Sequence, residues 1–244
     1  MEKVTVVILA KNNAATIEKT LQSVATFDEV LVCDTGSTDA TCDIVEKFPN
    51  TRLVKKPLTN FGKTRNEVAS EAKNDWILSL DSDEELSPEL LTELSQLCLS
   101  PDTVYSIPFK NFYRGQWIKG CGWYPDHDLR LYNRKKTAFS PFALHEKIEA
   151  TKVQKLHHHI HHYSYASAKD FLIKMERYSE LFAKQNAGKK SSLPKALRHG
   201  AWAFCKSYLI KRGFLDGHAG YIISAYNGQT AYYKYLKLAE KQCS

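Results

Sequence analysis

The 244-residue chain carries a net charge of +7 and has 43% hydrophobic and 25% charged residues, which is typical of a globular protein with a substantial core. No apolar run approaches the roughly 18 residues of a membrane span, and the run at residues 4–10 is too short for a signal peptide, so we expect neither. The six cysteines are scattered without a CxxC pair, which favours free thiols in a reducing cytosol over a disulfide framework or a zinc site.

Residues 1–97 alternate short apolar runs with helical patterns. We expect strands at residues 4–9, 29–33, 52–54 and 76–80, with polar residues directly after the first, second and fourth. Helical spacing predicts helices at residues 17–24 and 61–72, and a short helix that ends at residue 48. A further helix is expected from Ser87-Pro88 onward, because a capping hydroxyl there precedes proline. The pattern predicts an α/β fold with a mostly parallel sheet and helices on both faces.

From about residue 163 the pattern changes to long helices. Two apolar stripes recur at helical spacing, Phe171, Met175, Tyr178 and Phe182 in the first and Leu197, Ala201, Phe204 and Tyr208 in the second. Glycines at 213, 217 and 220 interrupt the chain before a tyrosine-rich segment. We therefore predict a catalytic domain at residues 1–163 and a helical extension at residues 164–244.

The charge is distributed unevenly between the two halves. Residues 1–150 hold 18 basic and 22 acidic side chains, whereas residues 151–244 hold 16 basic and 5 acidic ones. The basic C-terminal part also contains many aromatic residues, a combination that suits attachment to an anionic membrane surface. A phosphorylated lipid or a nucleic acid would suit the charge as well, and a solvated basic face with aromatic rings packed inward is the structural alternative.

Asp81-Ser82-Asp83 is the first candidate site, because it follows directly after an expected strand. Open α/β sheets bind ligands at the carboxyl ends of their strands. Carboxylates are hard ligands that suit Mg²⁺ or Mn²⁺, and such ions commonly link one or two carboxylates to substrate phosphates. The alternative is an acidic cap before the helix that begins at Ser87.

Three more side chains have comparable positions. Asp34 ends an earlier strand and could hydrogen-bond a nucleobase or a ribose, or it could be an ordinary turn aspartate. Lys63 and Arg65 belong to the start of a helix that could approach a diphosphate. For these two cations the alternative is a solvated helix face, which fits Lys63 better than Arg65.

Four ordered motifs resemble the signature of family 2 glycosyltransferases. They are Val7–Asn12, Asp28–Asp39, Gly62–Asn66 and Trp76–Glu84. The resemblance implies a GT-A-like, Rossmann-related fold, a nucleotide-sugar donor and inversion at the anomeric carbon. It also implies donor contacts from Lys11, Asp34, Lys63, Arg65 and Asp81, and metal contacts from Asp81, Asp83 and His145.

Later segments resemble a narrower branch of that family, the bacterial lipopolysaccharide or lipooligosaccharide core β-1,4-glucosyltransferases. These segments are Gly122–Asp126, Leu129–Arg134, His145-Glu146, His162–Tyr165 and Gly213–Gly217. The resemblance implies UDP-glucose as donor and a heptose of the lipid A–core oligosaccharide as acceptor, at the inner face of the cytoplasmic membrane. A family member that acts on another lipid-linked or cell-surface glycan is the alternative, with galactose or N-acetylhexosamine as other possible sugars.

An inverting transfer needs one general base to deprotonate the acceptor hydroxyl. In the resembling family this base is an acid shortly before a Leu-x-x-Arg-like segment, and Asp126 fills that place here. Pro125 stands where many relatives have an acid, so Asp128 and Glu146 stay open as alternatives, as does a structural ion pair with Arg130 or Arg134. His145 could bind the metal or the diphosphate, or be a hydrogen-bonded structural histidine.

Two further interpretations concern other classes of site and protein. The run His157–His162 contains five histidines and could bind a metal, but we favour a polar strand or loop near the acceptor. A non-enzymatic nucleic-acid-binding protein would account for the basic C-terminal part. It predicts a base-stacking platform or a known motif, and the sequence contains neither. We therefore expect no nucleic-acid partner.

Overall fold

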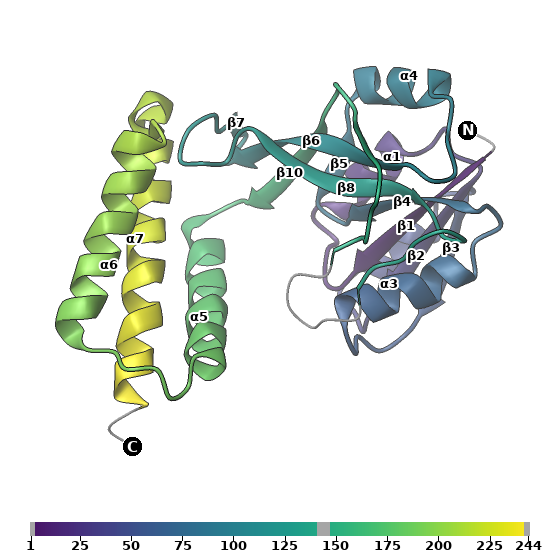
Figure 1. Cartoon of the computed structure of the whole chain (residues 1–244). Coiled ribbons are helices and arrows are strands. Elements are labelled where there is room, and N and C mark those ends of the chain that lie inside the picture. Colours follow the sequence, from purple (N-terminus) through teal and green to yellow (C-terminus); the bar gives the residue numbers. More distant parts are fainter. Residues whose placement is uncertain (1–2, 141–146, 242–244) are drawn as a thin grey trace. The chain divides into compact units, whose positions relative to one another are not determined.

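The computed structural model describes residues 3–140 and 147–241 and divides the chain into two compact units. Unit 1 consists of the chain up to Phe109 together with Asp126–His162, and unit 2 consists of Lys110–Pro125 together with the chain from Tyr163 onward (Figure 1). Residues 110–125 thus belong to unit 2, in contrast to the single boundary that we predict near residue 163.

Unit 1 is built on four parallel strands in the order β3-β2-β1-β4. They are β1 (Val4–Ala10), β2 (Glu29–Asp34), β3 (Thr51–Lys55) and β4 (Trp76–Asp81). Every residue of β1 and β2 is buried, which is the pattern of a sheet covered on both faces. The four strands that we expect from the sequence are confirmed.

Helices cover both faces of this sheet because its apolar residues alternate between two cores. One core lies under α1 (Ile17–Ser23), α2 (Thr41–Val45) and α4 (Pro88–Gln96), and it contains Val6, Ile8, Val30 and Val32. The other core lies under α3 (Phe61–Ser70), and it contains Val7, Leu9, Leu31 and Cys33 (Figure 1). The side chain of Ser87 caps α4 and precedes Pro88, as the sequence predicts. The side chain of Asn60 caps α3 in the same way.

The rest of the sheet is largely antiparallel. Beyond β4 the order continues β8-β6-β10-β5, with β8 antiparallel to both β4 and β6, and β10 antiparallel to β5. These strands are β5 (Glu84–Leu86), β6 (Val104–Tyr113), β8 (Asp126–Asn133) and β10 (Ile160–Tyr165), with β7 (Gln116–Trp117) and β9 (Val153–Lys155) pairing with β6. The α/β class is confirmed, and the sheet is mixed, with its parallel part confined mainly to the N-terminal half.

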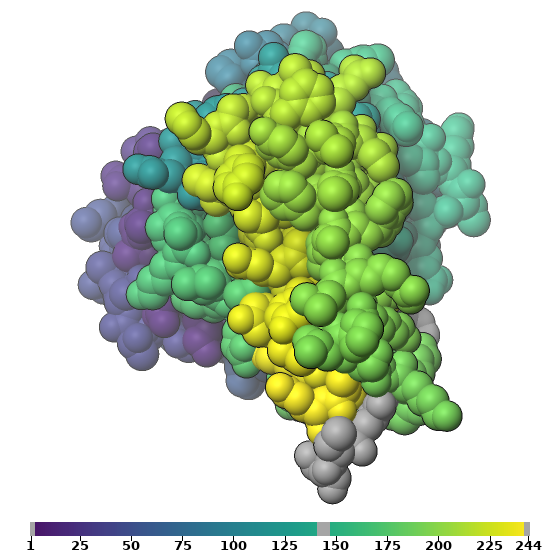
Figure 2. Space-filling model, turned by 90° about the vertical axis from the view of Figure 1, so that its left-hand side faces the viewer, coloured from purple at the N-terminus to yellow at the C-terminus, as the bar shows by residue number. Residues whose placement is uncertain are grey.

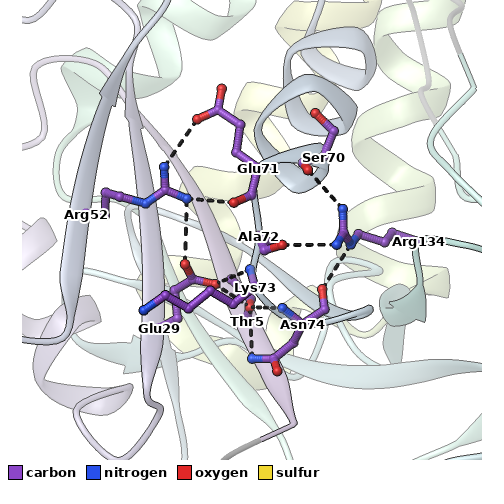
Figure 3. A network of polar contacts seen from close by, with 9 residues as sticks. All are labelled: Thr5, Glu29, Arg52, Ser70, Glu71, Ala72, Lys73, Asn74 and Arg134. Carbon is purple, nitrogen blue, oxygen red and sulfur yellow. Dashed lines mark hydrogen bonds and ion pairs between the residues drawn. The ribbon is translucent and has the colours of Figure 1, made fainter.

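A polar network holds the amino ends of the strands together (Figure 3). Glu29 of β2 accepts hydrogen bonds from the Thr5 hydroxyl at 2.8 Å and from the Lys73 backbone N–H at 2.7 Å, and its other oxygen lies 3.6 Å from Arg52 Nη2. Arg134 donates to three carbonyl groups at the end of α3 and the start of β4, those of Ser70, Ala72 and Asn74. The network therefore ties α3, β1, β2 and β8 at the edge opposite the carboxyl ends of the parallel strands.

Replacement of Glu29 with alanine is expected to destabilise unit 1. The Glu29 side chain is only 4% exposed, so the change leaves the buried Thr5 hydroxyl without its acceptor and also removes the acceptor of the Lys73 N–H. An unsatisfied buried group costs about 1–3 kcal/mol, and at about 2–4 °C per kcal/mol for a domain of this size the melting temperature falls by about 2–12 °C. Thermal unfolding followed by circular dichroism would measure this. Glu46→Ala, at an exposed position, is the control and is expected to change the melting temperature by no more than about 2 °C.

Unit 2 contains three long helices with two short helical turns between the last two. They are α5 (Ala168–Gln185), α6 (Leu193–Cys205), a π-helical turn (Lys206–Ile210), a 3₁₀ turn (Gly213–Asp216) and α7 (Gly217–Glu240). Throughout the described ranges, no helix combines the length and apolar character that crossing a membrane requires. The glycine-rich break is shorter than we predict, because Gly220 already lies inside α7.

Small residues form the contact between α6 and α7. A Cβ atom on Gly200 would lie 3.2 Å from the Gly228 carbonyl oxygen, and a Cβ atom on Gly220 would lie 1.7 Å from the Gly213 carbonyl oxygen. Ala196 and Gly200 are therefore the buried residues of α6, whereas Leu197 is exposed. The predicted stripe is therefore divided: Leu197 and Ala201 are exposed, whereas the rings of Phe204 and Tyr208 lie 5.8 Å and 6.0 Å from the Tyr221 ring of α7.

Asp216 joins the segment 110–125 to the helices of unit 2. Its buried carboxylate accepts hydrogen bonds from the backbone N–H groups of Lys119 at 3.1 Å and Gly120 at 2.6 Å. The Cys121 thiol contacts the Gly220 carbonyl oxygen at 3.4 Å. Two of the branch-level sequence motifs, those near residues 122 and 213, thus lie in segments that pack together within one unit.

Candidate donor and metal site

Two carboxylates flank the carboxyl end of β1 in unit 1. In the strand register Ala10 pairs with Asp34 of β2 and Leu9 pairs with Asp81 of β4. Since two strand spacings separate β2 from β4, their backbones are about 10 Å apart. The structure therefore brings Asp34 and Asp81 to the same edge of the sheet, where open α/β sheets bind their ligands.

Asp34 also forms the turn that follows β2. Its carboxylate accepts hydrogen bonds from the backbone N–H of Ser37 at 3.0 Å and of Gly36 at 3.3 Å, and Gly36 has a φ of 105° that favours glycine. Burial opposes ionisation of Asp34, but hydrogen bonds from Ser37 and Gly36 outweigh it and keep its pKa below the ordinary value. A charged carboxylate is thus held rigidly beside the end of β1.

The loop after β1 is tied to the turn after β2. Asn12, at a φ of 55°, receives a hydrogen bond from the Thr38 N–H at 2.8 Å and donates its own N–H to the Ser37 hydroxyl at 2.9 Å. Asn13 accepts from the Lys11 N–H at 2.8 Å. Lys11 is exposed, so its ammonium group is available at this edge of the sheet.

Two guanidinium groups from other elements reach Asp81. Arg65 of α3 contacts the Asp81 carboxylate through Nη2, and Nη2 of Arg130 in β8 lies 3.5 Å from the second carboxylate oxygen. Burial opposes ionisation of Asp81, but the charges of Arg65 and Arg130 outweigh it and hold the pKa of Asp81 well below its ordinary value. Asp81 is therefore ionised at neutral pH, with its charge balanced by both arginines.

Glu84 is the buried partner of Arg130. Its fully buried side chain accepts hydrogen bonds from Arg130 Nη2 at 2.7 Å and from the Asp81 backbone N–H at 2.8 Å. Burial raises the pKa of Glu84, and the Arg130 charge opposes that shift. Arg130 also lies over the Phe109 ring, 5.1 Å from its centre. Sequence reasoning missed the Glu84–Arg130 pair, because the contact exists only where β8 lies beside β4.

Asp83 has a histidine beside it. Nε2 of His162 in β10 lies 3.5 Å from a carboxylate oxygen of Asp83, and both side chains are about one-quarter exposed. Burial lowers the pKa of His162, but the Asp83 hydrogen bond and the Glu84 charge outweigh it, so the net shift is upward. Antiparallel pairing places His162 opposite Glu84 of β5, which is the long-range contact that brings it to Asp83.

The arrangement suits a divalent ion that is shared with a diphosphate. Within residues 3–140 and 147–241, no three His, Cys, Asp or Glu side chains form a group that could hold a metal by themselves. Magnesium sites in phosphate-binding enzymes commonly use one or two protein carboxylates and take their other ligands from substrate phosphates and water. Because Arg65 and Arg130 engage Asp81, the Asp83 carboxylate is the oxygen ligand that fits such an ion best.

The candidate general bases lie at the same edge. Because β8 runs antiparallel to β4, the start of β8 at Asp126 lies beyond the carboxyl end of β4. Asp126 is exposed, and Asp128 is 60% exposed with a carboxylate oxygen 3.4 Å from Arg130 Nε. The third candidate base, Glu146, and the candidate metal ligand His145 lie outside the described residues.

Two remaining groups of sequence candidates have structural explanations. The Lys63 side chain is 63% exposed and lies 3.9 Å from Glu67, one helical turn away, as expected for a solvated helix face. In the histidine run, the backbone N–H groups of His157 and His158 donate to the Glu93 carboxylate, and the strand begins at Ile160. The run is therefore a loop and a strand, and only its last member, His162, lies beside the Asp81–Asp83 segment.

The sequence matches the model of one known family, described as glycosyl transferase family 2, over residues 5–171. The match covers more than half of the chain and includes both carboxylates that flank β1. The chain belongs to glycosyltransferase family 2. This glycosyltransferase is 31% identical to an uncharacterized glycosyltransferase of Rickettsia bellii (strain RML369-C), across 98% of its own chain and 86% of that relative.

Two other similarities extend the comparison. The structure of S. aureus TarS 1–349 in complex with UDP superimposes on this chain with a TM-score of 0.52 at 17% sequence identity. The superposition covers 99% of this chain and 91% of TarS 1–349, and it confirms a GT-A-like fold. LpsC, a lipopolysaccharide core biosynthesis glycosyltransferase of Rhizobium meliloti (strain 1021), is 24% identical over 53% of this chain and 50% of its own length. The family prediction from the sequence is confirmed.

Proposed function

We propose that this family 2 glycosyltransferase transfers a hexose, glucose from UDP-glucose, with inversion at the anomeric carbon. The observation that carries the proposal is the pair Asp34 and Asp81 on either side of the β1 end, with Asp83 directly beyond. In the proposal Asp34 binds the uridine, Lys11 and Arg65 bind the diphosphate, and Asp81 binds the ribose or the metal. The UDP complex of TarS, which shares the fold, supports a uridine nucleotide.

The proposed chemical step is a single displacement. The Asp126 carboxylate accepts the proton of the acceptor hydroxyl as that oxygen bonds to the anomeric carbon, and the bond from that carbon to the diphosphate breaks to release UDP. A divalent ion, Mg²⁺ or Mn²⁺, would neutralise charge on the leaving diphosphate when bound. Asp83 and Asp81 are the residues proposed to hold it, and Nε2 of His162 lies 3.5 Å from the Asp83 carboxylate.

The proposed acceptor is a heptose of the lipid A–core oligosaccharide, reached at the inner face of the cytoplasmic membrane. The partial similarity to LpsC and the branch motifs of the sequence support a lipopolysaccharide acceptor. The basic C-terminal part supports peripheral contact with an anionic membrane. A second candidate is transfer to another cell-surface glycan from a different donor, and the TarS complex with UDP-GlcNAc, at a TM-score of 0.50, supports testing that sugar too.

Calorimetric titration with UDP, GDP and CDP, each with and without Mn²⁺, tests the donor site. We expect UDP to bind at least about tenfold more tightly with Mn²⁺ than without it, because an ion held by Asp83 would neutralise charge on the diphosphate. GDP and CDP are expected to bind at least about tenfold more weakly than UDP. Equal binding of all three nucleotides would contradict the uridine assignment, and binding that is independent of metal would contradict the metal site.

A further inference from the structure

Unit 2 presents an apolar surface at the end of α6 and the start of α7. Six large side chains that lie along it are each 47–68% exposed, namely Trp202, Leu209, Ile210, Phe214, Leu215 and Tyr221, and we call them the α6–α7 apolar face. Figure 2 looks onto these two helices, and the yellow-green segment that contains most of the six forms the upper part of the surface in view. Isolated exposed apolar residues are common, but a continuous patch of this kind marks an interaction site.

The Tyr208 ring joins two of the six residues, Phe214 and Tyr221. The Tyr208 ring lies 6.3 Å from the Phe214 ring and 6.0 Å from the Tyr221 ring, which joins the π-helical turn, the 3₁₀ turn and α7. The glycine contacts described above use the inner side of these helices. The large apolar side chains are left on the outer side, where no other described element of unit 2 buries them.

Charge identifies the partner of this face. Between Glu180 and Glu240 the chain contains ten basic residues and only one acidic residue, Asp216. Asp216 is buried and bonded to the backbone of Lys119 and Gly120, so it does not neutralise the surface. Lys206, Lys211 and Arg212, in contrast, are exposed among the residues of the apolar face. A surface that is both apolar and cationic is complementary to the headgroup region of an anionic bilayer.

We propose that the α6–α7 apolar face is the membrane-docking surface of this glycosyltransferase. Trp202 and the aliphatic side chains enter the boundary between headgroups and acyl chains, and the three cations contact lipid phosphates. The inference deepens the proposed function and rests on its lipid-linked acceptor for its biological meaning.

A second copy of the chain is a less suitable occupant. A two-fold symmetric dimer would bring the same patch of both copies together. Each patch carries Lys206, Lys211 and Arg212 without an exposed acid between Glu180 and Glu240, so like charges would face each other. Anionic lipid relieves this repulsion, whereas a second copy increases it.

Co-sedimentation of the full chain with vesicles tests the proposal. We expect binding to vesicles that contain phosphatidylglycerol, and binding at least about tenfold weaker to vesicles of phosphatidylcholine alone. Leu209→Ser combined with Leu215→Ser is expected to lower binding to the anionic vesicles at least about tenfold, because two apolar groups no longer leave water. Lys206→Gln combined with Lys211→Gln is expected to lower it by a similar factor, and this loss should shrink in high salt.

The matched control is Leu172→Ser combined with Ile173→Ser. These residues are 58% and 57% exposed on α5, a helix whose three acidic side chains offset three of its four basic ones, so the same loss of apolar surface there should leave vesicle binding unchanged. Equal losses in both pairs, or no binding of the wild type to anionic vesicles, would overturn the proposal. So would a dimer in sedimentation velocity that Leu209→Ser and Leu215→Ser dissociate. UDP titration of the same variants, expected to match the wild type, separates failure of this face from failure of the donor site.

Discussion

Replacing Asp83 with alanine is expected to remove the metal dependence of UDP binding and to lower transfer about 100- to 1,000-fold. The expectation follows from charge: the Asp81 carboxylate is already engaged by Arg65 and Arg130, so Asp83 is the oxygen ligand left for a divalent ion. Stabilisation of the leaving diphosphate by a metal contributes several kcal/mol, and each 1.4 kcal/mol or so corresponds to a factor of ten in rate. Calorimetry with and without Mn²⁺ measures the first effect, and a transfer assay in saturating Mg²⁺ measures the second.

The control for this change is Asp75→Ala. Asp75 precedes the same strand, β4, at its opposite end, and its side chain is 51% exposed beside Arg134. Loss of a surface ion pair there is expected to cost no more than about 1 kcal/mol of stability and to leave the metal dependence intact. Wild-type turnover of Asp83→Ala in saturating Mg²⁺ would show that the metal role assigned to Asp83 is wrong.

The parallel half of the sheet was predictable because each strand carries its own signal. The apolar runs of β1, β2 and β4 end directly at polar residues, so Asp34 and Asp81 could be placed at strand ends from their local sequence alone. The strand order does not follow from these local signals, because β4 pairs with β1 and not with its sequence neighbour β3. The donor side of the site is therefore largely encoded in residues 1–85.

The other half of the site depends on pairings between distant segments, which local patterns do not reveal. Arg130 reaches Glu84 only because β8 lies antiparallel to β4, and His162 reaches Asp83 only because β10 pairs with β5. In the sequence these residues are 46 and 79 positions from their partners. The spacing of apolar residues along a helix or a strand does not indicate which of several basic residues will be buried beside a given carboxylate.

Unit 2 illustrates a different limit. Hydrophobic periodicity identifies its helices, but it predicts that the largest apolar residues face the core. Here the contact between α6 and α7 uses Gly200 and Gly228, whose backbones approach closely, and Leu197 and Trp202 are exposed instead. A glycine spacing that permits close helix contact is therefore a stronger indicator of the buried face in this unit than apolar size.

Replacement of Asp126 with asparagine is expected to lower transfer about 100- to 10,000-fold without changing the affinity for UDP. An amide has nearly the same shape as the carboxylate but cannot accept the proton of the acceptor hydroxyl, so the loss should fall on the chemical step. Transfer to a heptose-containing core oligosaccharide measures the rate. Calorimetry with UDP and Mn²⁺ shows whether the donor site is intact.

Asp128→Asn is the matched comparison, because Asp128 is two residues along β8 and shares the same face of the strand as Asp126. Its carboxylate lies 3.4 Å from Arg130 Nε, which gives Asp128 a structural role as an ion-pair partner of that arginine. We therefore expect Asp128→Asn to lower transfer less than Asp126→Asn by at least about tenfold. A larger loss of transfer in Asp128→Asn than in Asp126→Asn would assign the base to Asp128. A loss of only a few-fold in both variants would assign it to Glu146, and Glu146→Gln would then test that assignment.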